Sequence, residues 1–206
     1  MKKNKRFFLF IFSLILFAGI SIASYSCKCR ACSNQEEAVV PLEVLAKADS
    51  FVISKTGKEF FDKYISVDFY QTKHASPYYE MVYKFFMPEK PYVNSLIKFT
   101  VDSTGILVQK REIVGIPRCR YYSEECEFSI DEETARKIAK ENGLEEGIKE
   151  WKAGFLWDVK RERYVWNILS TLHEMSGEDV YKATGKEIII DPTNGEVLAL
   201  NDWRVN

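Results

Sequence analysis

Five cysteines are the residues of this 206-residue chain best suited to chemistry. Cys27, Cys29 and Cys32 form a CxCxxC cluster, and thiolates spaced in this way bind soft metal ions such as zinc. A tetrahedral site needs a fourth ligand, and the sequence places no histidine near the cluster. We therefore expect no metal and no cofactor, with a redox or metal function of this cluster as an alternative. Cys29 and Cys32 could pair with each other or stay free.

Cys119 and Cys126 flank the hexapeptide RYYSEE and would close a short loop if they were bonded. Such bonds form in oxidising compartments, and the chain-entropy argument gives about 2.5 kcal/mol for a loop of this length. We predict a disulfide between these two residues. If Cys27 were lipidated, the four remaining cysteines could form two pairs.

The other candidate residues do not form a recognisable catalytic set. Glu174 follows His173, but the second histidine of the HExxH zinc-protease motif is missing, and His74 falls in a polar loop. Asp102 and Asp191 could bind calcium, yet an aspartate shortly before a glycine is first a turn former. We predict no catalytic residues, no metal ligands and no enzymatic activity, and the sequence does not identify the binding residues.

The first 26 residues have the layout of a secretory signal or membrane anchor. Four basic residues among the first six precede residues 7–23, which are uncharged and strongly apolar. Residues 24–27 resemble a bacterial lipobox. Three outcomes are open: cleavage after Ala23, cleavage before Cys27 with lipidation of that cysteine, or no cleavage and a single-pass anchor. We predict a bacterial protein anchored to a membrane outside the cytoplasm, in the periplasm or on the cell surface.

The charge of the chain argues against one class of partner. The net charge is −1, and residues 1–26 carry four basic and no acidic side chains, which leaves −5 for the remainder. Nucleic-acid binding needs a basic surface, so we expect no nucleic-acid partner.

The remainder of the chain alternates helical and strand patterns twice. In the first half we predict a helix from Pro41 to Gly57, strands over 65–70, 78–86, 96–101 and 106–114, and a turn at 102–105. In the second half we predict a helix with its N-cap at Ser129 and its end at Asn142-Gly143, strands over 148–159, 164–172, 187–190 and 197–200, a polar loop over 175–185 and a turn at 191–195.

The two halves follow the same order, which predicts an internal duplication. We also expect most of the four tryptophans to fill the core, whereas several exposed on one sheet face would mark a binding surface. The predicted segments are a signal or anchor (1–26), a polar tether (27–40), a first unit (41–117), a disulfide-closed linker (118–127) and a second unit (128–206).

The second half resembles a PepSY domain. The resemblance rests on the helix 130–139, the strand 164–168 and the ending 188–198, which reads IIIDPTNGEVL. In PepSY domains this ending is a strand, an Asp, a short turn with Thr-Gly, and Glu-Val-Leu, whereas here Asn194 stands between the Thr and the Gly. The first half matches more loosely, through the turn at 102–105.

The resemblance implies a fold and a class of function. It implies an α+β fold with two tandem PepSY-like units, each a helix packed on a small antiparallel sheet, and no catalytic residues. PepSY domains occur in propeptides of thermolysin-like peptidases and in exported bacterial proteins, with peptidase inhibition as the proposed role. We therefore expect a membrane-tethered, non-catalytic module that binds a protein of the cell envelope, such as a peptidase. The alternative is an envelope protein that binds a small molecule or ion, which a large apolar pocket would favour.

Overall fold

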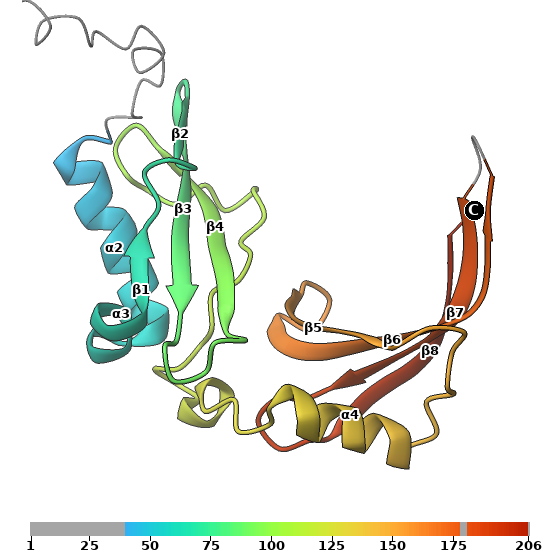
Figure 1. Ribbon diagram of the computed structural model, residues 1–206. Coiled ribbons are helices and arrows are strands. Elements are labelled where there is room, and N and C mark those ends of the chain that lie inside the picture. Colours follow the sequence, from blue (N-terminus) through green and yellow to red (C-terminus); the bar gives the residue numbers. More distant parts are fainter. Residues whose placement is uncertain (1–39, 178–180, 206) are drawn as a thin grey trace, which may run out of the picture. The chain divides into compact units, whose positions relative to one another are not determined.

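The computed structural model describes residues 40–177 and 181–205, which form an α+β fold with two four-stranded antiparallel sheets (Figure 1). The predicted leader, its cleavage sites and the CxCxxC cluster with Cys27 lie outside the described residues. Among the residues that are described, no helix is both long enough and apolar enough to cross a membrane.

The first sheet is built around β3. It contains β1 (Ile65–Val67), β2 (Lys73–Ala75), β3 (Tyr78–Phe86) and β4 (Asn94–Asp102). β4 pairs with β3 along its whole length, and β1 and β2 pair with the two ends of β3. Helix α2 (Leu42–Thr56) runs along one face of this sheet, and the short helix α3 (Lys58–Tyr64) follows it (Figure 1).

Alternation along β3 and a helical stripe on α2 build the first core. Alternation in the sequence YYEMVYKFF places Tyr79, Met81, Tyr83 and Phe85 on one face of β3, and all four are buried. Residues spaced by four on α2 are buried in the same hydrophobic cluster: Val44, Ala48 and Val52. The ring of Phe51 meets that of Phe99 edge to face at 4.9 Å, so the helix and the sheet interlock through aromatic side chains.

Three sequence predictions for the first half need correction. The helix ends before Gly57, as predicted, but α3 starts directly after it and was missed, because seven residues show too little periodicity. The strand predicted over 65–70 stops at Val67, since Asp68 begins a hydrogen-bonded turn. The strand predicted over 106–114 makes only isolated bridges to β4, because a turn at Arg111 interrupts it.

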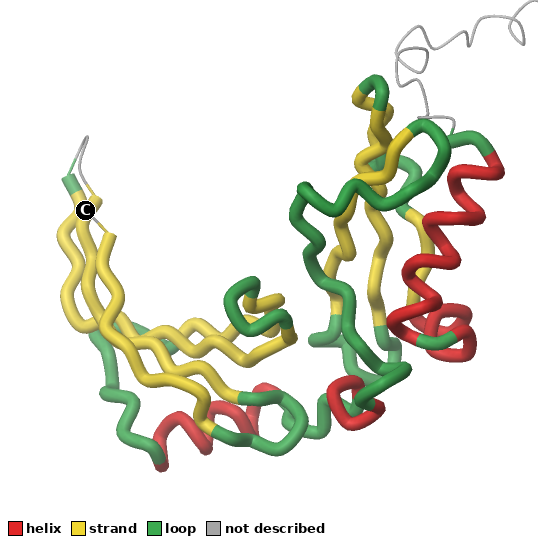
Figure 2. Tube along the Cα trace, turned by 180° about the vertical axis from the view of Figure 1, so that it is seen from behind, coloured by secondary structure: helices red, strands yellow, loops and turns green. Residues whose placement is uncertain are grey.

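The second sheet has the simple order β5-β6-β7-β8. Its strands are β5 (Lys152–Asp158), β6 (Arg163–Ser176), β7 (Tyr181–Ile190) and β8 (Val197–Val205). Helix α4 (Glu132–Glu141) lies on one face of this sheet (Figure 2). Its buried Ala135 and Ala139 belong to the same hydrophobic cluster as Trp166, Ile168, Ile188 and Ile190.

The second half also departs from the sequence predictions. The N-cap of α4 is Asp131 and not Ser129, because the Asp131 carboxylate accepts the Thr134 N–H at 2.8 Å. Most of the polar loop predicted over 175–185 is strand, since β6 and β7 extend beyond the part of the sheet that α4 covers. The strand predicted over 148–159 begins only at Lys152.

The two sheets are separate, but they share aromatic contacts. Tyr164 at the start of β6 lies in the core of the first sheet, with its ring 5.6 Å from that of Phe85. Phe128 contacts both of these rings, and Phe155 stacks on Tyr164 at 5.1 Å. The segment between the two sheets therefore contributes to the core.

Candidate functional site

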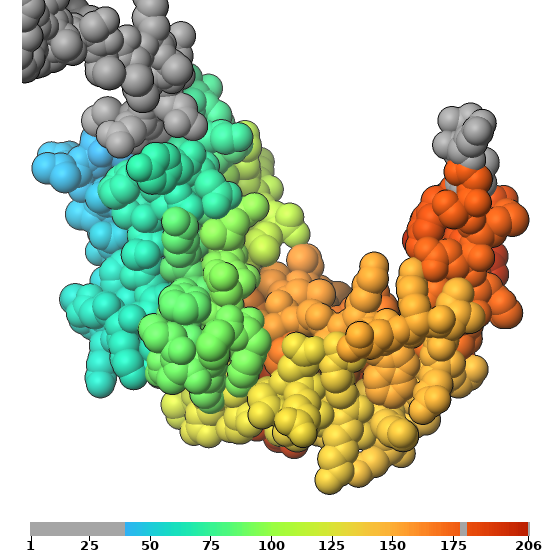
Figure 3. Space-filling model, in the orientation of Figure 1, coloured from blue at the N-terminus to red at the C-terminus, as the bar shows by residue number. Residues whose placement is uncertain are grey.

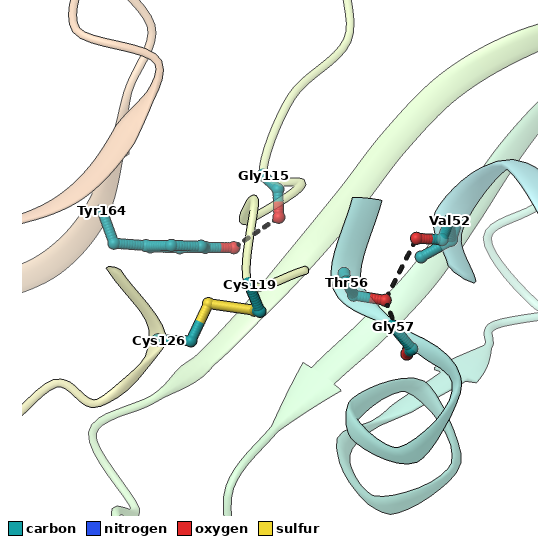
Figure 4. Close-up of a disulfide and its surroundings, with 7 residues drawn as sticks. All are labelled: Val52, Thr56, Gly57, Gly115, Cys119, Cys126 and Tyr164. Carbon is teal, nitrogen blue, oxygen red and sulfur yellow. Dashed lines mark hydrogen bonds between the residues drawn. A yellow bond between two sulfur atoms is a disulfide. The ribbon is translucent and has the colours of Figure 1, made fainter. Parts of the chain in front are cut away.

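A groove lies beside the disulfide, where α2 ends and α3 begins. Figure 4 shows this region, with the bonded cysteines between the Thr56–Gly57 corner and the Gly115–Tyr164 contact. The groove has a volume of about 480 Å³. Apolar and aromatic residues, the two bonded cysteines and three charged residues contribute to its lining. Its lining residues include Phe60, Tyr64, Met87, Cys119, Ser123 and Cys126.

A glycine and a hydroxyl shape the corner at the groove. Gly57 has φ +85°, a backbone conformation that other residues rarely adopt, and this conformation separates the two helices. The Thr56 hydroxyl donates to the Val52 carbonyl oxygen at 3.0 Å and lies buried at the end of α2. This local chemistry ends one helix and lets the next begin at an angle, which opens the groove.

The disulfide-closed loop forms one wall of the groove. The Cys119 and Cys126 sulfur atoms lie at bonding distance, and both residues are buried in the first core. The loop is also fastened to α2, because the Arg120 N–H donates to the Lys55 carbonyl oxygen at 3.0 Å. A short 3-10 helix, η2 (Ser123–Cys126), completes it. The loop is thus held at both its ends and on one side.

Two neighbouring tyrosines project from this loop. Tyr121 is 65% exposed and Tyr122 is 47% exposed, although both are large aromatic side chains. The Arg118 guanidinium lies over the Tyr122 ring, 5.4 Å from its centroid, and also reaches the Glu125 carboxylate at 3.4 Å. A tyrosine pair next to an arginine, on a restrained loop, presents apolar area with polar groups at its edge.

Both lysines at the rim of the groove are paired with carboxylates. Lys58 contacts Asp62, one helical turn further along α3. The Tyr64 hydroxyl and the Lys63 ammonium both donate to the Glu89 carboxylate, the second at 3.2 Å. The hydrogen bond from Tyr64 is the main cause that lowers the pKa of Glu89, and Lys63 adds to the effect. The groove thus offers apolar contacts and a rim on which both lysines have acidic partners.

The other candidate residues from the sequence have structural surroundings. His74 is exposed and stacks on the Tyr79 ring at 4.6 Å, and His173 is exposed on β6. The Asp102 carboxylate accepts the backbone N–H groups of Thr104 and Ile106 within its turn. In residues 40–177 and 181–205, no three His, Cys, Asp or Glu side chains come together in a way that could hold a metal ion.

The second aspartate is also a turn former. Asp191 accepts the Thr193 N–H at 2.8 Å and an Arg163 N–H at 2.7 Å. Both of its carboxylate oxygens are therefore used inside the protein, whereas Asp102 in the first half uses its Oδ1 within its turn. The calcium alternative gains no support from either turn.

The tryptophans pack within the protein. Trp166 is 1% exposed, and Trp151 and Trp157 lie partly buried against the two hydrophobic clusters. Trp203 lies against Gly185, and its indole N–H donates to the Ser170 and Lys186 carbonyl oxygens. The tryptophans therefore do not form an exposed patch on one sheet face of the described residues. Tyr121 and Tyr122, inside the RYYSEE hexapeptide, are an exposed aromatic pair instead.

The comparisons with known proteins do not add a family. No protein-family model matches the chain, and no curated protein sequence matches it. The resemblance to PepSY domains therefore stays a prediction that rests on the residues quoted above.

Proposed function

We propose that this chain is an exported, membrane-tethered binding module that recognises a protein of the cell envelope and carries out no reaction itself. The apolar N-terminal segment with its basic start supports export and attachment to a membrane. Lipidation of Cys27 is part of the proposal. A peptidase is the class of partner that the PepSY resemblance implies.

One observation carries the choice of a protein as the ligand: the exposed tyrosine pair on the disulfide-closed loop. Tyr, Trp and Arg are the residues that most often dominate binding energy at protein interfaces. Here Tyr121 and Tyr122 stand next to Arg118, and the loop that carries them is bonded through Cys119 and Cys126. A restrained loop loses little conformational entropy on binding, so the tyrosines are preorganised for contact.

The groove extends this surface. Ser123, Cys119 and Cys126 belong both to the loop and to the lining of the groove, so the tyrosine pair and the groove share one wall. A partner that packs on the tyrosines could insert an apolar side chain between Phe60 and Met87. We name the combination of Tyr121, Tyr122 and the groove the loop surface.

Tandem PepSY-like units also belong to the proposal. The order of strands supports it: β4 follows β3, an Asp-containing turn follows β4, and residues 106–114 return beside β4. In the second sheet β7 follows β6, the turn at Asp191 follows β7, and β8 returns beside β7. The helix comes before the sheet in each half.

A crosslinking pull-down tests the binding function. The full chain in detergent is exposed to envelope extract, and captured proteins are identified by mass spectrometry. We expect one protein at near-stoichiometric yield with the wild type, and about tenfold less with the Tyr121→Ala/Tyr122→Ala double variant. The matched control is Tyr70→Ala, which removes a 77% exposed tyrosine from the turn between β1 and β2 and should leave the yield unchanged.

Two results would overturn the proposal. Failure to capture any specific protein argues against the binding function, and equal capture by the double variant argues against the loop surface. Mass spectrometry of the mature N-terminus tests the export claim separately. A native product in the soluble cell interior with residues 7–23 intact would disprove it.

The groove also favours a second candidate function, the binding of a small molecule. Its volume of about 480 Å³ falls in the range of ligand pockets, and aromatic and thioether side chains line it. Ser123→Trp would fill the groove from an exposed position while leaving the tyrosine pair in place. Loss of ligand-induced thermal stabilisation in this variant, with protein capture unchanged, would identify the small molecule as the ligand.

A further inference from the structure

β8 leaves one edge of the second sheet open. This strand is the last in the order β5-β6-β7-β8, and within residues 40–177 and 181–205 it pairs only with β7. From Ala199 to Val205 the pairing with β7 runs without a shift in register. Each edge strand carries backbone N–H and C=O groups that point away from its neighbour, and among the described residues no other segment bonds to those of β8.

Little in β8 protects this edge against further pairing. Proteins commonly block an open edge with proline, with charged side chains and lysine above all, or with a bulge within the strand. Residues 197–205 read VLALNDWRV and contain neither proline nor lysine, and Asp202 and Arg204 are their two charged residues, of opposite sign. The irregularity in the pairing of β8 falls at its first residues, opposite Ile189 and Ile190. The remaining seven residues form a regular template.

The first sheet shows how such an edge is closed elsewhere in this protein. Residues 106–114 follow β4 as β8 follows β7, but they touch β4 only at two isolated bridges, Lys98 with Val114 and Val101 with Leu107. A turn from Val108 to Arg111 interrupts them. A segment broken in this way cannot present a continuous row of backbone groups, whereas β8 can.

The outer part of β8 is also accessible. Five of its last six residues are exposed, among them Leu200 and Val205 at 44% each. In Figure 3 no other described element covers the visible face of the orange end of the second sheet. The open edge therefore coincides with an exposed surface.

Side chains on the two faces of β8 specify what could pair with it. Asp202 lies opposite Lys186 on β7, and the Lys186 ammonium contacts Glu145, which follows α4 in the chain. Asp202 and, two residues later, Arg204 therefore project from the face of the sheet that α4 covers. Trp203 and Val205 project on the other face. A strand added antiparallel to β8 would place a basic residue beside Asp202 and an acidic one beside Arg204, with an apolar residue between them beside Trp203.

We propose that the outer edge of β8 binds an extended segment of another polypeptide, in which an acidic and a basic residue flank an apolar one, as an additional strand of the second sheet. This strand site is distinct from the loop surface, and the two can bind different parts of one partner or two partners.

A designed peptide tests the strand site. A labelled eight-residue peptide with Glu-Val-Lys at its centre is titrated with the full chain in detergent, and binding is followed by fluorescence anisotropy. Arg204→Glu should weaken binding about fivefold, and exchanging the peptide's Glu for Lys should restore it. Lys110→Glu, an exposed charge reversal in the interrupted segment of the first sheet, is the matched control and should change nothing.

Hydrogen exchange locates the bound peptide. Amides in 197–205 should exchange more slowly when peptide is added, and those in 106–114 should not change. Absent binding, an ineffective Arg204→Glu, or protection elsewhere would overturn the proposal. If the amides in 197–205 became more protected from exchange as the protein concentration rises, with no peptide present, the proposal would be overturned. A second copy of this chain would then be the partner of β8. The Tyr121→Ala/Tyr122→Ala variant should bind the peptide normally, so failure of the loop surface and failure of the strand site are distinguishable.

Discussion

The Tyr164 hydroxyl donates a hydrogen bond to the Gly115 carbonyl oxygen at 2.9 Å, although 49 residues separate the two in the chain (Figure 4). The contact is buried, and burial raises the pKa of the tyrosine far above its usual range, so the hydroxyl keeps its proton. Gly115 has φ +79°, and a Cβ there would lie 2.4 Å from the Leu96 carbonyl oxygen. The contact thus joins the start of β6 to the segment that follows the first sheet.

Removing this hydroxyl should destabilise the protein. Tyr164→Phe leaves the Gly115 carbonyl oxygen buried without its donor, which costs about 2 kcal/mol of unfolding free energy. Urea denaturation followed by circular dichroism measures the change. Tyr70→Phe removes an exposed hydroxyl and serves as the control, with no expected change. Equal stability of the two variants would show that the contact contributes nothing.

Loss of the disulfide should destabilise the protein and weaken its binding. Replacing Cys119 and Cys126 by Ser should lower the unfolding free energy by about 2.5 kcal/mol, because the unfolded chain gains freedom. Denaturation of the wild type with and without a reducing agent checks the same quantity. The variant with both cysteines replaced should also capture less partner protein, because the loop that carries Tyr121 and Tyr122 would no longer be closed by the disulfide. Unchanged stability after complete reduction would contradict the prediction.

The N-cap of α4 can be tested with a matched pair. Asp131→Ala removes the carboxylate that accepts the Thr134 N–H and should lower Tm by about 3 °C. Ser129→Ala removes the residue that the sequence predicts as the cap, and it should leave Tm unchanged. Differential scanning calorimetry resolves the two cases. A larger effect of Ser129→Ala would restore the predicted capping box.

The ionisation of Asp68 should make the free energy of unfolding depend on pH in the acid range. Burial disfavours its charged form, but hydrogen bonds from Gln71 and Tyr70 and the nearby Lys84 ammonium outweigh burial and lower its pKa below 3.8. When folding lowers the pKa of a carboxyl, the group stabilises the folded state at pH values above its pKa in the unfolded chain. This stabilisation is lost as the pH falls through its pKa in the folded protein.

Asp68→Asn should therefore flatten this part of the pH profile. The wild type should lose stability as pH falls below 3.8, and the variant should lose less over the same interval. At neutral pH the variant should be less stable by about 2 kcal/mol, because hydrogen bonds to a charged group are lost. Denaturation at several pH values measures both effects, and parallel profiles for the two proteins would rule out a role for Asp68.

Local rules explain which parts of the structure were predicted correctly from the sequence. Alternation in YYEMVYKFF predicted the buried face of β3, and Gly57 predicted the end of α2. The turns at Asp102 and Asp191 also followed from residue types, because an aspartate side chain bonds its own neighbouring N–H groups. The Cys119–Cys126 pair could be predicted because its members are close in sequence.

Tertiary surroundings explain the errors. The ends of β6 and β7 within 175–185 read as loop because Ser176, Lys182, Thr184 and Gly185 break the apolar pattern, and these ends extend beyond α4. Asp131 displaced Ser129 as the cap because the chain enters the helix two residues later than the motif suggests. The groove could not be predicted, since it needs Met87 and Ser123 beside the Thr56–Gly57 corner.

The sequence by itself determined the α+β class, the positions of most helices and strands, and the turns, because each depends on residues close together in the chain. Only the tertiary structure decided that the halves form two separate sheets and that Tyr164 reaches Gly115. It also decided that no other described segment pairs with the outer edge of β8, while residues 106–114 are interrupted. Those features depend on which distant segments come into contact, and short-range residue patterns carry no information about such contacts.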